Sequence, residues 1–229
     1  MTPASSGDER SALGKVIWFS IIEIAAGISG IALYFYFIGQ FFLSLANLGL
    51  GPTATADDVL AALGPVFTGL TLAVPVVVVI GIVALAMLAL AFRELKKVDP
   101  SFSTPALLVW LQIAGVILVG AGIVPLVNAI PSIIATSASV GVGGSPLAVF
   151  NAISSIFFAF ILIGLGGLIA FIGLVGGEIL GLWRLGSKYN ELTLKLGAIF
   201  VIFPLLSAIA PILVLIGAIQ ARGKLPKPQ

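Results

Sequence analysis

Cysteine and histidine are both absent from this chain of 229 residues. Without cysteine it can form no disulfide, zinc thiolate, iron–sulfur cluster or cysteine nucleophile. Without histidine it offers no imidazole ligand to a b-type haem and no Ser–His–Asp triad. We therefore expect no metal site and no cofactor on this chain, and we expect that it is not an enzyme.

Charged residues are scarce as well. They make up 9% of the sequence, whereas hydrophobic residues make up 60%, and the mean hydropathy is +1.25. A soluble domain carries about 25% charged residues because its surface must be hydrated. Lipid or protein partners must therefore cover the apolar surface, which predicts an integral protein of the cell membrane. The net charge of +2 is too small to indicate a nucleic-acid-binding surface.

Long apolar runs supply the membrane-spanning helices. A span needs about 20 mainly apolar residues, and five stretches are long enough: 16–45, 60–92, 106–132, 148–183 and 197–220. We expect an all-α integral membrane protein with about five transmembrane helices. Residues 15–221 would form a single helical domain between a polar N-terminal tail, 1–14, and a polar C-terminal tail, 222–229.

The distribution of Lys and Arg predicts the orientation. With the N-terminus in the cytoplasm, eight of the eleven basic residues fall on the inner side, where such residues accumulate. The loops 51–58 and 136–146 contain no basic residue and would face outward. All three tryptophans lie beside the inner charges, as an interfacial aromatic belt requires.

The last apolar segment fits this topology less well than the others. Five full spans would leave Arg222, Lys224 and Lys227 outside, and Pro204 and Pro211 interrupt the segment. The two forms open to it are a proline-kinked span and a re-entrant hairpin that returns the tail to the cytoplasm. We favour the kinked span, because the segment is too short for two crossings of a ~30 Å core.

Several apolar stretches are longer than a membrane requires, and the surplus lies at their outer ends, 41–51, 59–67, 130–136 and 146–155. One explanation is helix tilt, a thick membrane or short interfacial helices. The other is that these apolar ends pack against each other or against a partner outside the lipid. The sequence leaves both open.

Three polar residues within the predicted spans share one depth near the cytoplasmic side. Glu23 lies about 12 Å along a helix from Lys15, and Glu178 about 9 Å from Arg184. Gln112 falls near the same level. Ionisable groups inside membranes are rare and often functional, so these residues form a candidate intramembrane polar cluster for a proton or a cation. The structural alternative is that each carboxyl group hydrogen-bonds to a neighbouring helix.

Glycines at four-residue spacing lie beside this cluster. Gly173, Gly177 and Gly181 leave one side of their helix thin, and such rows allow two helix backbones to approach closely. We expect these three residues to serve helix packing.

The inner loops contain the most distinctive motifs. These are VDPSFSTP at 98–105, GLWRLGSKYNE at 181–191 and APILVLIG at 210–217. On these motifs the chain resembles a family of archaeal multi-pass membrane proteins, the domain of unknown function 973. The resemblance implies an archaeal membrane, in a thermophile, and no activity or catalytic residue.

The first two motifs predict a fixed structure on the cytoplasmic side. Asp99 and Thr104 lie in what reads as a tight, capped turn, with 188–191 alongside it. Glu191 would then pair with one of the basic residues Arg93, Lys96 and Lys97.

Two functions remain in competition. The leading hypothesis is a non-catalytic membrane subunit that self-associates or scaffolds a larger membrane complex, among lipids and other membrane subunits. The absence of Cys and His, the glycine row and the surplus apolar ends support it. The alternative is a small proton- or cation-coupled channel or transporter that uses the intramembrane carboxyl groups.

Overall fold

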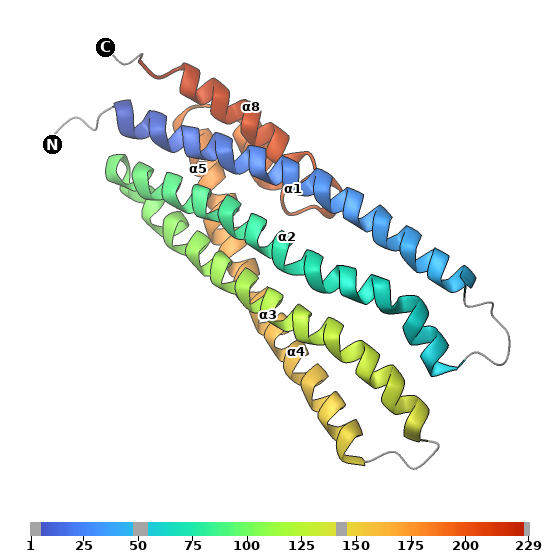
Figure 1. Ribbon diagram of the computed structural model, residues 1–229. Coiled ribbons are helices and arrows are strands. Elements are labelled where there is room, and N and C mark those ends of the chain that lie inside the picture. Colours follow the sequence, from blue (N-terminus) through green and yellow to red (C-terminus); the bar gives the residue numbers. More distant parts are fainter. Residues whose placement is uncertain (1–5, 48–54, 141–145, 227–229) are drawn as a thin grey trace. The chain divides into compact units, whose positions relative to one another are not determined.

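The computed structural model describes residues 6–47, 55–140 and 146–226, and each element in these ranges is a helix (Figure 1). Four stretches within them are long and apolar enough to cross a membrane. They comprise α1 (Ser6–Asn47), α2 (Ala56–Val98), α3 (Ser103–Val140) and α4 (Pro146–Gly173), the last continued by the π-helix η2 (Leu174–Ile179) and α5 (Leu180–Lys188). The all-α membrane fold predicted from hydropathy is confirmed.

The helix bounds differ from the predicted spans at their ends. α1 begins inside the predicted polar tail, 1–14, where Ala12 and Leu13 are fully buried. α3 continues through 136–140, which were expected in an outward-facing loop. Residues 141–145 of that loop and half of the other, 51–54, lie outside the described residues.

The chain divides into two compact units. Unit 1 comprises Met1–Ile28, Val79–Val116 and Gly167–Gln229, and unit 2 comprises Ser29–Val78 and Ile117–Gly166. Each of α1, α2, α3 and α4 contributes one end to unit 1 and the other to unit 2. The predicted single domain, 15–221, thus consists of two units connected by continuous helices.

Side chains cap the N-terminal ends of two helices. At the start of α2, the Thr55 backbone N–H donates to Asp58 Oδ2 at 2.9 Å while the Asp58 N–H donates to Thr55 Oγ1 at 3.3 Å, which is a reciprocal capping box. Between α2 and α3, Asp99 caps the short 3-10 helix η1 (Pro100–Phe102). The Ser101 N–H donates to Asp99 Oδ1 at 3.0 Å, and this hydrogen bond lowers the pKa of Asp99.

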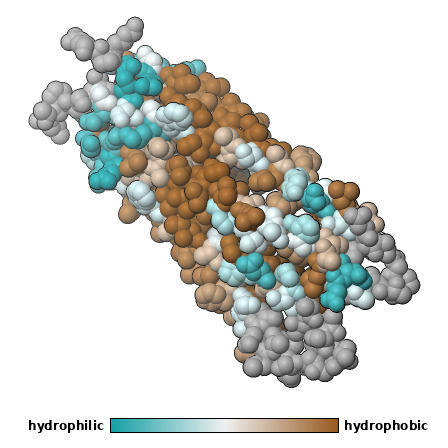
Figure 2. Space-filling model, in the orientation of Figure 1, coloured by the Kyte–Doolittle hydropathy of each residue, from teal (hydrophilic) through white to brown (hydrophobic). Residues whose placement is uncertain are grey.

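Unit 1 has an apolar core to which α1, α2, η1, α3, α5, α6 (Leu192–Phe200) and α8 (Ala210–Gly223) contribute. Its largest fully buried side chains are Leu13, Val16, Leu88, Phe92, Leu95, Phe102, Val109, Leu182, Leu185, Leu194 and Val214. The rings of Phe92 and Phe102 lie 5.8 Å apart between centroids. Hydrophilic residues gather at the end of unit 1 where the described chain starts and finishes, and apolar residues cover the adjoining surface (Figure 2).

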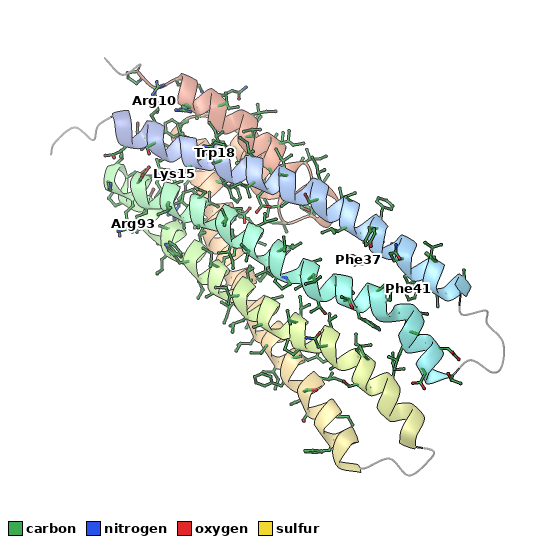
Figure 3. The ribbon with its side chains drawn as sticks, in the orientation of Figure 1. Arg10, Lys15, Trp18, Phe37, Phe41 and Arg93 are labelled. Carbon is green, nitrogen blue, oxygen red and sulfur yellow. The ribbon has the colours of Figure 1, made fainter. Side chains whose placement is uncertain are left out.

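Unit 2 packs its four helix segments in sequence order through small residues. The Phe37 ring of α1 lies over Gly69 of α2, where an added Cβ would be 2.6 Å from Cε1 of the ring. Gly120 of α3 meets Val78, and Gly122 meets Ile163 of α4. Phe37 and Phe41 lie on the same end of α1 (Figure 3).

The last apolar segment is a hairpin and not a span. α6 (Leu192–Phe200) and α8 (Ala210–Gly223) pack against each other, with the single turn α7 (Pro204–Ser207) between them. At about 1.5 Å per residue, α6 and α8 are about 14 and 21 Å long, short of a ~30 Å core. Of the two predicted forms the structure has the re-entrant hairpin, so the favoured kinked span is wrong.

Proline chemistry explains the turn. Pro204 and Pro211 lie in the first turns of α7 and α8, where the missing N–H is not needed. Phe203, before Pro204, is extended (φ −95°, ψ 115°), because the helical conformation is disfavoured before proline. The two prolines therefore begin new helices where a kink within one helix was expected.

Polar contacts hold the returning end of the hairpin in unit 1. Arg10 Nη2 donates to the carbonyl oxygens of Leu225 and Pro226, each at 3.1 Å. Lys224 Nζ lies 2.6 Å from Glu191 Oε1. The end of α8 therefore lies beside the beginning of α1, on the same side as the N-terminus.

A labelling experiment tests this topology, and the cysteine-free chain suits it. We expect single cysteines from Ser11→Cys and Arg222→Cys to react with an impermeant maleimide from one side of oriented membrane vesicles. The cysteine from Asp57→Cys should react only from the other side. All three native positions are exposed, and the unsubstituted protein is the blank. Labelling of the Arg222→Cys protein from the Asp57→Cys side would contradict the hairpin.

Candidate functional site

The predicted glycine row packs within the chain, against α3. A Cβ on Gly173 would lie 2.5 Å from the backbone of Gln112, and one on Gly177 would lie 2.6 Å from the backbone nitrogen of Val109. Gly181 faces the Phe92 ring and Pro105. Real Cβ atoms do not approach backbone this closely, so glycine is required there. All three residues predicted for helix packing face a neighbouring helix of the same chain.

This close approach brings Glu178 to Gln112. Gln112 Nε2 donates to Glu178 Oε2 at 3.1 Å. The two residues are 7% and 8% exposed, respectively. Helical side chains lean toward the N-terminus of their helix, so Glu178 reaches back toward the level of Gly173, whose backbone lies on Gln112. A hydrogen bond to a neighbouring helix is what the structural alternative for Glu178 predicted.

Glu23 completes the predicted cluster from α1. It is partly buried and lies within electrostatic range of Glu178. One turn earlier on α1, the buried Ser20 hydroxyl donates to the Val16 carbonyl oxygen at 3.0 Å. The three predicted residues thus come from three separate elements of unit 1, and of these Gln112 and Glu178 are in direct contact.

Two features of the cluster were not visible in the sequence. Glu178 lies in the π-helix η2, and single π-helical turns inside α-helices occur often at functional sites. Gln112 Oε1 is buried and accepts no hydrogen bond within the described structure. A buried acceptor without a donor is unfavourable by about 1–3 kcal/mol, so this oxygen is a place where a proton donor or a small cation would be bound.

The cluster is suited to protons or hard cations. Its ligand atoms are oxygens of two carboxyl groups and one amide, which suit hard ions and not soft transition metals. Within the described ranges no group of three or more His, Cys, Asp and Glu side chains is placed to hold a metal ion.

Basic residues gather at the end of unit 1 where α1 begins (Figure 3). Lys15 pairs with Glu94, Lys188 Nζ lies 2.7 Å from Glu9 Oε1, and Arg184 donates to the Ser101 carbonyl oxygen. These contacts connect α1 to α2, α1 to α5, and α5 to η1. The predicted turn therefore does lie alongside the end of α5.

The predicted partner of Glu191 is wrong. Glu191 pairs with Lys224 from the returning hairpin and not with a basic residue of α2. Instead, the Nζ atom of Lys97 in α2 lies 4.0 Å from Oδ1 of Asp8. The pairing could not be predicted because the tail was expected on the opposite side of the membrane.

Tyr189 lies near Glu9, at the same end of unit 1, and is not among the predicted site residues. Burial, with a smaller effect of the nearby Glu9 carboxylate, raises the pKa of its hydroxyl. The next residue, Asn190, has φ 52°, a left-handed conformation that Asn tolerates and that ends α5. Tyr189 and Asn190 thus shape the turn between α5 and α6.

Unit 2 contains a groove of about 440 Å³ between α2 and α3. It is lined by Leu60, Gly64, Phe67, Thr68, Thr71, Leu72, Val127, Asn128 and Pro131. Thr71 Oγ1 donates to Asn128 Oδ1 at 3.1 Å, with the Phe67 carbonyl oxygen as a second acceptor at 2.9 Å. The sequence gives no signal for this pair, because Thr71 is one of several polar residues in an otherwise apolar helix.

Comparison with known protein families decides the classification. A family model described as "Protein of unknown function (DUF973)" matches residues 11–229, nearly the whole chain. The chain belongs to this family. The resemblance found in the loop motifs is thereby confirmed. No curated protein and no solved structure matches the chain, so the assignment of a function depends on the geometry described above.

The glycine contacts predict a large effect of a small substitution. Gly177→Ala should destabilise the protein by about 1–3 kcal/mol, because the new methyl group would be forced against the α3 backbone. We expect a lower unfolding midpoint in detergent, followed by tryptophan fluorescence.

Gly27→Ala is the matched control. Gly27 is also helical and in unit 1, but a Cβ there meets nothing within 4 Å. Alanine is a better helix former by about 1 kcal/mol, so this variant should unfold at or above the wild-type midpoint. An unchanged midpoint for Gly177→Ala would refute the close packing.

Proposed function

We propose that the protein is a non-catalytic multi-pass subunit of the cell membrane that associates with further copies or with other membrane subunits. The observation that carries this proposal is the length of its apolar helices. α1 has 42 residues and α2 has 43, so each is about 63–65 Å long, twice a ~30 Å hydrocarbon core.

The surplus length carries large exposed apolar side chains. Phe157 lies 26 residues before Trp183, about 39 Å along the helix, and is 68% exposed. Phe42 lies about 40 Å along α1 from Lys15 and is 64% exposed. Contiguous apolar surface that extends beyond the lipid is unfavourable in water, and a protein partner would cover it.

The glycine row no longer supports this proposal, because α3 occupies it within the chain. The surface available for association is therefore the outer ends of the helices. The absence of cysteine and histidine remains the support for a non-catalytic role.

Two phenylalanines of α4 form a matched pair for testing the proposal. Phe171 is 59% exposed but lies only about 18 Å along the helix from Trp183, within the depth of the lipid. We expect Phe157→Ala to weaken association by about tenfold or more, the effect of losing a well-packed aromatic contact. Phe171→Ala should leave association unchanged.

The measurement is the native mass after mild extraction, compared with the 23.5 kDa of one chain. The wild type should appear as a homo-oligomer or with other chains in fixed ratio. A wild-type protein that is a lone monomer, or equal masses for the two variants and the wild type, would refute association through the outer ends.

A second candidate function is a proton- or cation-coupled channel or transporter. The buried Gln112–Glu178 contact, with Glu23 nearby, favours it. In proteoliposomes Glu178→Gln should abolish proton or cation flux, because the amide can neither carry a proton nor balance a cation. Glu94→Gln is the control, since Glu94 pairs with Lys15 outside the cluster. Equal flux in the two variants would contradict this function.

A further inference from the structure

The Gln112–Glu178 pair has two hydrogen-bonded arrangements that differ by one proton. In the observed arrangement the amide Nε2 donates to the carboxyl Oε2 at 3.1 Å. If the amide turns by half a rotation, its oxygen faces the carboxyl group and accepts a hydrogen bond from the protonated form. A glutamine amide offers both a donor and an acceptor, and a carboxyl group becomes a donor only when protonated. One glutamine can thus serve both states of the same carboxyl group.

The unpaired acceptor in the structure points to the second arrangement. Gln112 Oε1 is buried without a donor among the described residues, and Gln112 is only 7% exposed. An O–H on Glu178 would supply the missing donor once the amide has turned. The added proton therefore gives this oxygen a donor, while the turned amide directs its N–H groups to the position that the oxygen held before.

The charges around Glu178 also favour the binding of a proton. Glu23 on α1 is a charged side chain within electrostatic range of it, and α3 contributes the neutral Gln112 as its hydrogen-bond partner. An unbalanced charge at this depth is unfavourable, and so are two like charges close together. A single proton on the pair removes the repulsion between its carboxyl groups.

We propose that Glu178 is a binding site for one exchangeable proton, with Gln112 as the residue that adapts its hydrogen bond and Glu23 as the neighbouring carboxyl group. Glu23 is the less buried of the two carboxyl groups. The inference concerns occupancy of the site and is independent of both association and transport.

Labelling with a hydrophobic carbodiimide in liposomes tests the proposal. The protonated carboxyl group gives its proton to a carbodiimide nitrogen, and its oxygen attacks the central carbon. The resulting O-acylisourea rearranges to an N-acylurea, so the protein gains the mass of one whole reagent molecule. We expect one adduct, located on Glu178 by peptide mass spectrometry, with a labelling rate that falls as the pH rises.

Two variants and one ion make this test specific. Glu178→Gln should lose the adduct, and Glu94→Gln should keep it, because Glu94 is paired with Lys15 away from the cluster. Protection of Glu178 by sodium at constant pH, relative to a large organic cation, would overturn the proposal in favour of a metal-cation site.

Infrared difference spectroscopy on the whole protein gives a second readout. A protonated carboxyl group has a carbonyl stretch that shifts in D₂O, and this band should be present in the wild type and absent from Glu178→Gln. Absence of both the adduct and the band from the wild type would overturn the proposal. An adduct on Glu178 in a protein without flux would support the proton site and count only against transport.

Discussion

In unit 1 the end of α4 and the following η2 approach the backbone of α3 closely, because Gly173 and Gly177 place no side chain between them. A larger residue at either position would push the helices apart by the width of a methyl group or more. This separation would also break the hydrogen bond between Gln112 and Glu178, which depends on the same approach. Helix packing and the polar cluster are therefore consequences of one contact.

The second constraint is the shortage of charge. Within the described structure the ion pairs of unit 1 concentrate at one end, where Lys15, Lys188 and Lys224 each reach a carboxylate from another element. These pairs are partly exposed to solvent, and surface pairs contribute only about 0–1 kcal/mol each. Their number and their distribution over α1, α2, α5, α6 and α8 give that end a defined arrangement. The buried carboxyl group of Glu178, by contrast, accepts its hydrogen bond from a neutral amide.

Much of the fold and part of the site follow from simple counting along the sequence. Runs of about 20 apolar residues predict spans regardless of tertiary context, because an unpaired backbone group is unfavourable in lipid. Counting 1.5 Å per residue from the basic ends was enough to place Glu23, Gln112 and Glu178 at one depth. The count could not show that Gln112 and Glu178 touch, since depth says nothing of the direction in which a side chain points.

The prolines of the last segment show what counting along the sequence cannot decide. Pro204 and Pro211 are compatible both with a kinked span and with the starts of new helices. The choice depends on partners far away in the sequence: Glu191 for Lys224, and the backbone carbonyls of Leu225 and Pro226 for Arg10. The length of the segment alone favours the kinked span, which is the wrong form.

The sequence by itself determined that this is a helical membrane protein, where its four long apolar helices lie, which residue types it lacks and at what depth its polar residues lie. These properties depend on composition and on distances along the chain, so they can be predicted without knowing which residues pack together. Only the tertiary structure decided that the hairpin turns back, that the glycine row faces α3 and that Glu178 meets Gln112. Each of these is a contact between residues distant in sequence, and its geometry is fixed only when the helices pack.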